Sequence, residues 1–133
     1  MPVLTIIRGL PASGKSTLAK KLNCLHLEAD MFFVHNEPYC YDASKVEAAH
    51  LWCQRMALHS LLLGCDVVVS NTFTRKWELD PYFQIAKESG SRVEIYRTTG
   101  SYIGLHNVPA EVVEAMRSRF ENVANEIILG VSK

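Results

Sequence analysis

The sequence lacks a charge excess of either sign and any long apolar run. Lysine and arginine together number 14, as do aspartate and glutamate, so the formal net charge is zero. This excludes the broad basic surface of a non-specific nucleic-acid-binding protein, although a local basic patch stays open. The longest apolar stretch, around residues 61–69, is interrupted by Gly64 and Asp66 and is shorter than the roughly 18 residues of a membrane helix.

Paired cysteines and metal-binding spacings are absent as well. The four cysteines are scattered without a C-x-x-C pair, and the five histidines show no regular ligand spacing. Only Met1 and Pro2 precede the first apolar segment, which is too short for the core of a signal peptide. We therefore expect reduced thiols, no membrane contact and a cytoplasmic protein. The 133 residues, 48% hydrophobic and 21% charged, suit a single domain over residues 1–133.

Strand-like and helix-like segments alternate along the chain. Short apolar segments rich in β-branched residues predict strands at 3–8, 25–28, 66–70 and 92–97. Longer segments with apolar residues three and four apart predict helices at 15–23, 43–63, 77–89 and 110–129. Because helical crossovers of this length join parallel strands, the pattern predicts a three-layer α/β/α sandwich with about four parallel strands.

The most specific motif follows the first predicted strand. Residues 9–16 read G-L-P-A-S-G-K-S and fit the phosphate-binding P-loop pattern G-x-x-x-x-G-K-[ST]. Backbone N–H groups and a helix N-terminus surround the phosphates in such a loop. Lys15 is expected to reach the β- and γ-phosphates, and Ser16 to offer its hydroxyl to Mg²⁺. The predicted site for ATP comprises Gly9, Pro11, Ala12, Ser13, Gly14, Lys15, Ser16 and Thr17.

Four segments carry a family resemblance: GLPASGKSTLAKKL, EADMFF, DVVVSNTFTRKWELDPY and HNVPAEVVEAMRSRFE, in this order. They resemble the small P-loop kinases related to the kinase domain of phage polynucleotide kinase and, more distantly, the zeta toxins. Compact bacterial and phage proteins classed as AAA-family ATP-binding proteins are the most similar. The resemblance implies a P-loop NTPase fold with strand order 2-3-1-4. It also implies transfer of the γ-phosphate of ATP to a hydroxyl acceptor, which is a nucleotide, a nucleic-acid end or another small molecule.

Asp30 follows the second predicted strand and is therefore expected beside the P-loop. Phosphoryl transfer to a hydroxyl needs a carboxylate that orients the nucleophile, and the resemblance implies this catalytic role for Asp30. A helix N-cap before Met31 is the alternative. Polynucleotide kinases carry an acceptor-binding arginine three residues later, where this sequence has Phe33, so a nucleic-acid acceptor is less favoured.

Other strand ends supply further candidates. Asn71 stands where polynucleotide kinases have an aspartate; it could hold a Mg²⁺-bound water without adding charge, or only begin a loop. Arg8 and Arg97 end their strands and could neutralise charge on the transferring phosphoryl group. Arg117 and Arg119 are expected to form ion pairs on the surface of the last helix.

The link after the fourth predicted strand bears on catalysis. The resembling kinases have a helical lid with arginines there, whereas residues 98–108 contain no arginine or lysine and suit a shortened lid. We therefore expect slow intrinsic ATP turnover, with Arg8 or Arg97 as the chain's own substitutes, unless the acceptor, a second subunit or another protein completes the site. A nucleotide-binding switch or partner-binding module with weak or no catalysis is the alternative function; it would need no acceptor base.

Overall fold

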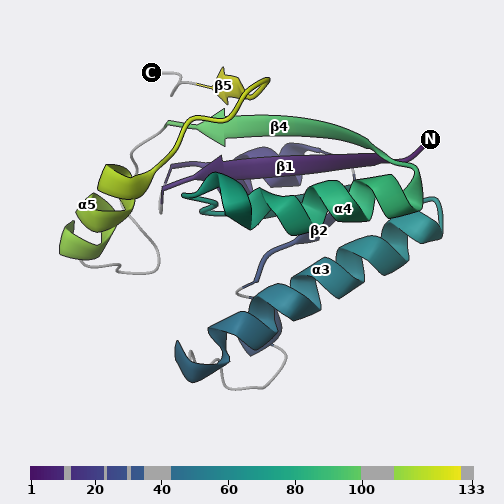
Figure 1. Cartoon of the computed structure of the whole chain (residues 1–133), viewed down its shortest axis with the longest axis horizontal. Helices are drawn as coiled ribbons and strands as arrows, with labels where there is room; N and C mark the ends of the chain where they lie inside the picture. Colours follow the sequence, from purple (N-terminus) through teal and green to yellow (C-terminus); the bar gives the residue numbers. More distant parts are fainter. Residues whose placement is uncertain (11–12, 23, 30, 35–42, 100–109, 130–133) are drawn as a thin grey trace.

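The computed structural model describes residues 1–10, 13–22, 24–29, 31–34, 43–99 and 110–129. Within these ranges a five-stranded sheet has the order β2-β3-β1-β4-β5 (Figure 1). Each neighbouring pair of strands is parallel, so their carboxyl ends meet at one edge of the sheet. The strands are β1 (Val3–Gly9), β2 (Leu25–Leu27), β3 (Val67–Asn71), β4 (Arg92–Thr98) and β5 (Ile127–Leu129).

Helices cover both faces of the sheet. Leu4 and Ile6 of β1 belong to the larger core, with side chains of α3 and α4, whereas Ile7 packs with Ala19 of α1 on the other face. The predicted three-layer α/β architecture is thus confirmed. Successive residues of a strand point to opposite faces of the sheet, so each face has a core of its own. The helices are α1 (Lys15–Lys21), α2 (Met31–Val34), α3 (Val46–Leu62), α4 (Asp80–Ser89) and α5 (Ala110–Arg119), with 3-10 helices η1 (Ala43–Lys45) and η2 (Lys76–Leu79).

The predicted order of the first four strands is confirmed, but the last predicted helix is wrong in its second half. Helix α5 ends at Arg119, and residues 127–129 pair with β4 as a fifth strand. One contact and one backbone conformation set this segment apart from a helix: the Glu121 N–H donates to the Thr74 carbonyl at 2.7 Å, and further along Asn125 has a left-handed backbone with φ of 66°. A helix cannot continue through such a residue.

Helix α5 lies beyond the arrowheads of β1 and β4, at the carboxyl edge of the sheet (Figure 1). The motif that joins β1 to α1 reaches the same edge. In the parts of the chain that the structure describes, no helix has the length and apolar character needed to cross a membrane.

Candidate phosphate-binding site

Two glycines shape the P-loop at the end of β1. Gly14 has a left-handed backbone with φ of 99°, which side chains rarely allow. A Cβ atom on Gly9 would lie 2.9 Å from the Thr98 carbonyl oxygen and 2.5 Å from Ser13 Oγ. Ser13 Oγ in turn lies 2.6 Å from Thr98 Oγ1, a buried hydrogen bond that ties the loop to β4. The motif therefore adopts a backbone that requires both of its glycines.

The lysine and serine of the motif lie at the first turn of α1. Lys15 Nζ donates to the Leu10 carbonyl at 2.9 Å, so the ammonium is folded back along its own loop. Ser16 and Thr17 are exposed. Pro11 and Ala12, two other predicted nucleotide-binding residues, lie outside the described residues, as does the predicted base Asp30.

Ser16 contacts the carboxylate of Glu28, a residue that was not among the site residues predicted from the sequence. Ser16 Oγ donates to Glu28 Oε2 at 2.6 Å, and Ser70 Oγ donates to the same oxygen at 2.7 Å. His26 Nε2 lies 2.9 Å from it. Burial alone would raise the pKa of Glu28, but the hydrogen bonds from His26, Ser16 and Ser70 outweigh it and lower the pKa to about 2. Glu28 is therefore a carboxylate anion at neutral pH.

A sequence signal for Glu28 did exist. Leu27 packs in the larger core, so the residues on either side of it face the layer that contains α1. His26 pairs in register with Val68, which packs against α1. Considering which face each strand residue occupies, as well as where the strand ends, would have placed Glu28 next to the P-loop.

Asn71, the second predicted metal residue, faces the opposite layer. Val67 and Val69 belong to the larger core, so alternation puts Asn71 on their side and Ser70 on the side of α1. Asn71 Oδ1 accepts a hydrogen bond from the Ala29 N–H at 3.0 Å, and Asn71 Nδ2 has no hydrogen-bond partner among the described residues. The polar contacts of Ser16 thus run to Glu28, and through it to Ser70, instead of to Asn71.

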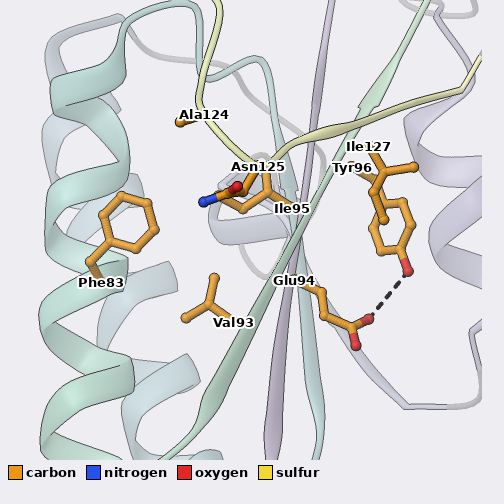
Figure 2. A pocket seen from close by; sticks show the side chains of 8 residues that line it. All are labelled: Phe83, Val93, Glu94, Ile95, Tyr96, Ala124, Asn125 and Ile127. Atoms are coloured by element: carbon orange, nitrogen blue, oxygen red, sulfur yellow. Dashed lines mark hydrogen bonds between the residues drawn. The ribbon is translucent and has the colours of Figure 1, made fainter.

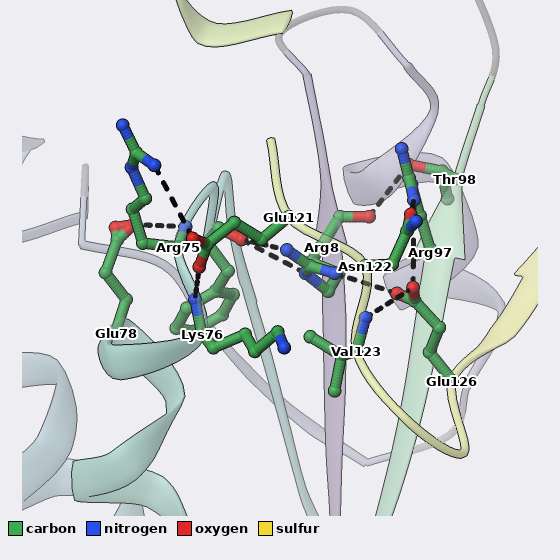
Figure 3. A network of polar contacts seen from close by, with 11 residues as sticks. Arg8, Arg75, Lys76, Glu78, Arg97, Thr98, Glu121, Asn122, Val123 and Glu126 are labelled. Carbon is green, nitrogen blue, oxygen red and sulfur yellow. Dashed lines mark hydrogen bonds and ion pairs between the residues drawn. The ribbon is translucent and has the colours of Figure 1, made fainter. Parts of the chain in front are cut away.

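Arg8 is committed to structural contacts (Figure 3). Its side chain is 0% exposed; Nε and Nη2 donate to the Phe73 carbonyl at 3.0 and 2.6 Å, and Nη1 donates to Glu126 Oε1 at 2.9 Å. The guanidinium also lies 4.3 Å from the centre of the Phe120 ring. Arg8 shares its face with Ile6, away from α1, and holds the turn after β3 to the segment before β5. These contacts differ from the phosphate-neutralising role that its strand-end position predicted.

Arg97 lies beside Arg8 in register but is partly exposed. Its Nη1 donates to Asn122 Oδ1 at 2.6 Å, and its guanidinium lies 4.4 Å from the centre of the Phe120 ring. The side chain keeps 23% of its surface exposed. Arg97 also borders a cavity of about 140 Å³ beside the P-loop, which is lined by Leu10, Ser13, Arg97, Thr98, Thr99, Arg117 and Phe120.

Arg117 also lines this cavity, although the sequence predicted only a surface ion pair for it. Its Nε does pair with Glu114 at 3.2 Å on the surface of α5, as the sequence predicted. However, the position of α5 at the sheet edge also brings Arg117 to the cavity beside Leu10 and Ser13. Helix α5 thus brings a second arginine to the cavity that Arg97 borders.

A larger cavity, of about 410 Å³, lies elsewhere (Figure 2). It is formed by α4, β4 and the segment before β5, and one polar contact at its rim joins Tyr96 OH to Glu94 Oε1 at 3.2 Å. None of the P-loop residues that the structure describes borders this cavity, so its volume does not link it to the phosphate-binding motif. Its lining consists of Phe83, Val93, Glu94, Ile95, Tyr96, Ala124, Asn125 and Ile127.

The family described as an AAA domain matches residues 4–99, from the start of β1 to the end of β4. The chain belongs to this family of P-loop kinases. Membership implies nucleotide binding. The family match ends before α5, so it does not account for Arg117.

A human relative shares part of the chain. NEDD4-binding protein 2 of Homo sapiens is 32% identical over a stretch that makes up 68% of this chain. The same stretch is 6% of the human protein, so this chain spans a small part of that relative's length.

Solved structures resemble the chain in fold. A sugar kinase of Janibacter sp. HTCC2649 has a TM-score of 0.70 at 13% identity, with 98% of this chain and 86% of that chain covered. A chain of the Pnkp1/Rnl/Hen1 RNA repair complex has a TM-score of 0.71 at 18% identity, covering 90% of this chain and 44% of that one. Kti12 of Chaetomium thermophilum, in complex with ADP-AlF3, has a TM-score of 0.65 at 14% identity, covering 96% and 88%. The fold is thus that of P-loop kinases.

Proposed function

We propose that the chain transfers the γ-phosphate of ATP to a hydroxyl group on a nucleotide, a nucleic-acid end or another small molecule. The observation that carries the proposal is the cavity beside the P-loop, where Arg97 and Arg117 come together next to Leu10 and Ser13. Arginines there can neutralise charge that develops on a phosphoryl group during transfer. A module that only binds nucleotide gains nothing from groups that act on the transition state.

Lys15 and Ser16 would bind the nucleotide. Lys15 Nζ already lies over the loop through its bond to the Leu10 carbonyl, and it would exchange this oxygen for phosphate oxygens when ATP binds. The exposed Ser16 hydroxyl suits Mg²⁺, which prefers oxygen ligands and keeps several waters beside substrate phosphates. When bound, the ion would neutralise charge on the phosphates.

The remaining roles concern transfer itself. Asp30 follows β2, and we propose that it orients the acceptor hydroxyl and accepts its proton. Arg97 is held in place by Asn122 and Phe120, whereas Arg117 is largely exposed on α5. Such an open site excludes water poorly, so we expect slow ATP turnover until an acceptor or a partner covers it.

The test is transfer of labelled γ-phosphate from ATP, screened over nucleosides, nucleotides, oligonucleotides and sugars. Wild type should label one acceptor class, and Lys15→Ala should lose both MgATP binding and transfer while keeping its fold, because Lys15 contributes charge to phosphate. Lys20→Ala is the matched control, since Lys20 is exposed on the same helix. MgATP binding without any labelled acceptor would indicate the nucleotide-binding switch, and unchanged ATP affinity in Lys15→Ala would refute the P-loop assignment.

A further inference from the structure

Glu28 has no part in the reaction outlined above, yet its carboxylate contacts the P-loop. Its side chain is only 22% exposed, and Oε2 is the common acceptor for the hydroxyls of Ser16 and Ser70. His26 Nε2 lies 2.9 Å from Oε2 and 2.8 Å from Ser70 Oγ. A half-buried anion that is held by three neighbours has a fixed position and cannot turn to solvent as a surface glutamate does.

The contact with Ser16 is compatible with metal binding by the same hydroxyl. A serine hydroxyl has one proton to donate and two lone pairs to offer. When the proton points at Glu28, the lone pairs are directed away from the carboxylate and remain available to a cation. Glu28 therefore orients the Ser16 hydroxyl as a Mg²⁺ ligand requires, and its carboxylate would be one hydrogen bond away from a ligand of any cation that Ser16 holds.

Charge at this position has no other source on β3. Asn71 is neutral and faces the larger core, where Oδ1 accepts a hydrogen bond from the Ala29 N–H. Ser70, which does face α1, carries no charge and donates to Glu28. Across the described ranges, no three His, Cys, Asp or Glu side chains are grouped to hold a metal by themselves. A single carboxylate with hydroxyls suits an ion that arrives with phosphates and water as its other ligands.

We propose that Glu28 is the acidic residue that positions the nucleotide-bound Mg²⁺ in this protein, acting through Ser16 and metal-bound water. Ser70 and His26 hold the carboxylate toward the P-loop. In the polynucleotide kinases the acidic residue stands at the position of Asn71, at the end of β3. In this chain the proposed acidic residue, Glu28, lies directly after β2. This role of Glu28 rests on the proposed function only in that nucleotide must bind at the P-loop.

The experiment measures metal binding and needs no turnover. ADP affinity is determined by calorimetry with Mg²⁺ and with EDTA, and Mn²⁺ binding to the ADP complex is followed by electron paramagnetic resonance. Glu28→Gln should weaken Mn²⁺ binding by about 10–100-fold, the usual scale for an outer-shell partner of a metal ligand, and leave ADP affinity in EDTA near wild type. Glu28→Asp, which keeps the charge, should recover part of the loss. Glu94→Gln is the control, because Glu94 lines the distant cavity beside β4.

The outcomes separate the two proposals. If wild type and Lys15→Ala bind ADP equally, the P-loop function itself fails. If wild type shows a metal-dependent affinity and Glu28→Gln retains all of it, only the role of Glu28 is overturned. Should Glu28→Gln not fold, Ser70→Ala decides: it removes one hydroxyl from the carboxylate without changing charge, and we expect weaker Mn²⁺ binding. Unchanged Mn²⁺ affinity in folded Ser70→Ala would then overturn the proposal.

Discussion

Replacement of Arg8 by methionine separates a structural role for this arginine from a role at the phosphate. The variant keeps an unbranched apolar side chain in the buried position but leaves the Phe73 carbonyl without two donors. It also leaves the carboxylate of Glu126, which is 4% exposed, without its nearest cation. Removing one partner of a buried ion pair typically costs about 3–5 kcal/mol, because the other charge remains buried.

The lower end of that range is the expected loss here. Glu126 Oε2 still accepts from the Val123 N–H at 2.9 Å and lies 3.7 Å from Arg97 Nη1. We therefore expect Arg8→Met to lower the free energy of unfolding by about 3 kcal/mol. The fall in Tm that corresponds to a given loss of stability depends on chain length, and for 133 residues this loss corresponds to roughly 10 °C.

Urea unfolding followed by circular dichroism measures this loss, and a double-mutant cycle with Glu126→Gln assigns it. The double variant should be more stable than the sum of the two single losses predicts by about 1–3 kcal/mol, because neutralising Glu126 removes the unpaired charge. ADP affinity of folded Arg8→Met, measured well below its Tm, should stay close to wild type. Wild-type stability combined with a large loss of nucleotide affinity would refute the structural role and return Arg8 to the phosphate site.

Four further substitutions test the site. Asp30→Asn should keep ATP affinity and slow phosphoryl transfer by about 10²-fold or more in rapid-quench assays; a normal rate would leave Asp30 as a helix cap. Arg97→Ala and Arg117→Ala should each lower kcat by about 10²–10³-fold with smaller effects on nucleotide affinity, and a silent Arg117→Ala would remove α5 from the catalytic site. Gly9→Ala should lower the free energy of unfolding by about 1–3 kcal/mol in thermal melts, because its Cβ would crowd the Thr98 carbonyl; wild-type stability would show that the loop relaxes freely.

The nucleotide-binding loop could be predicted because its requirements are local. The motif needs glycine where the local backbone adopts a conformation that other residues rarely allow, and Gly14 indeed adopts a left-handed conformation. The runs of apolar residues likewise determine which segments become strands, and the family resemblance supplied the order in which the first four lie.

The second half of the last helix could not be predicted in the same way. Residues 110–129 have helical spacing throughout, but the Glu121 N–H bonds to Thr74 and residues 127–129 pair with the free edge of β4. A strand of three residues forms only when a neighbouring strand is there to pair with it. No periodicity within the segment indicates that the edge of β4 is available.

The sequence by itself therefore determined the P-loop motif, the layered α/β architecture and the edge of the sheet at which that motif lies. Only the tertiary structure decided which strand-end side chains meet there. Arg8 and Asn71 end their strands at the predicted edge but face away from α1, whereas Glu28, directly after β2, contacts Ser16. Arg117 of α5 borders the cavity beside Leu10 and Ser13. The physical reason is that position along a strand sets the edge, but the partners of a polar side chain depend on which distant segments pack against its face.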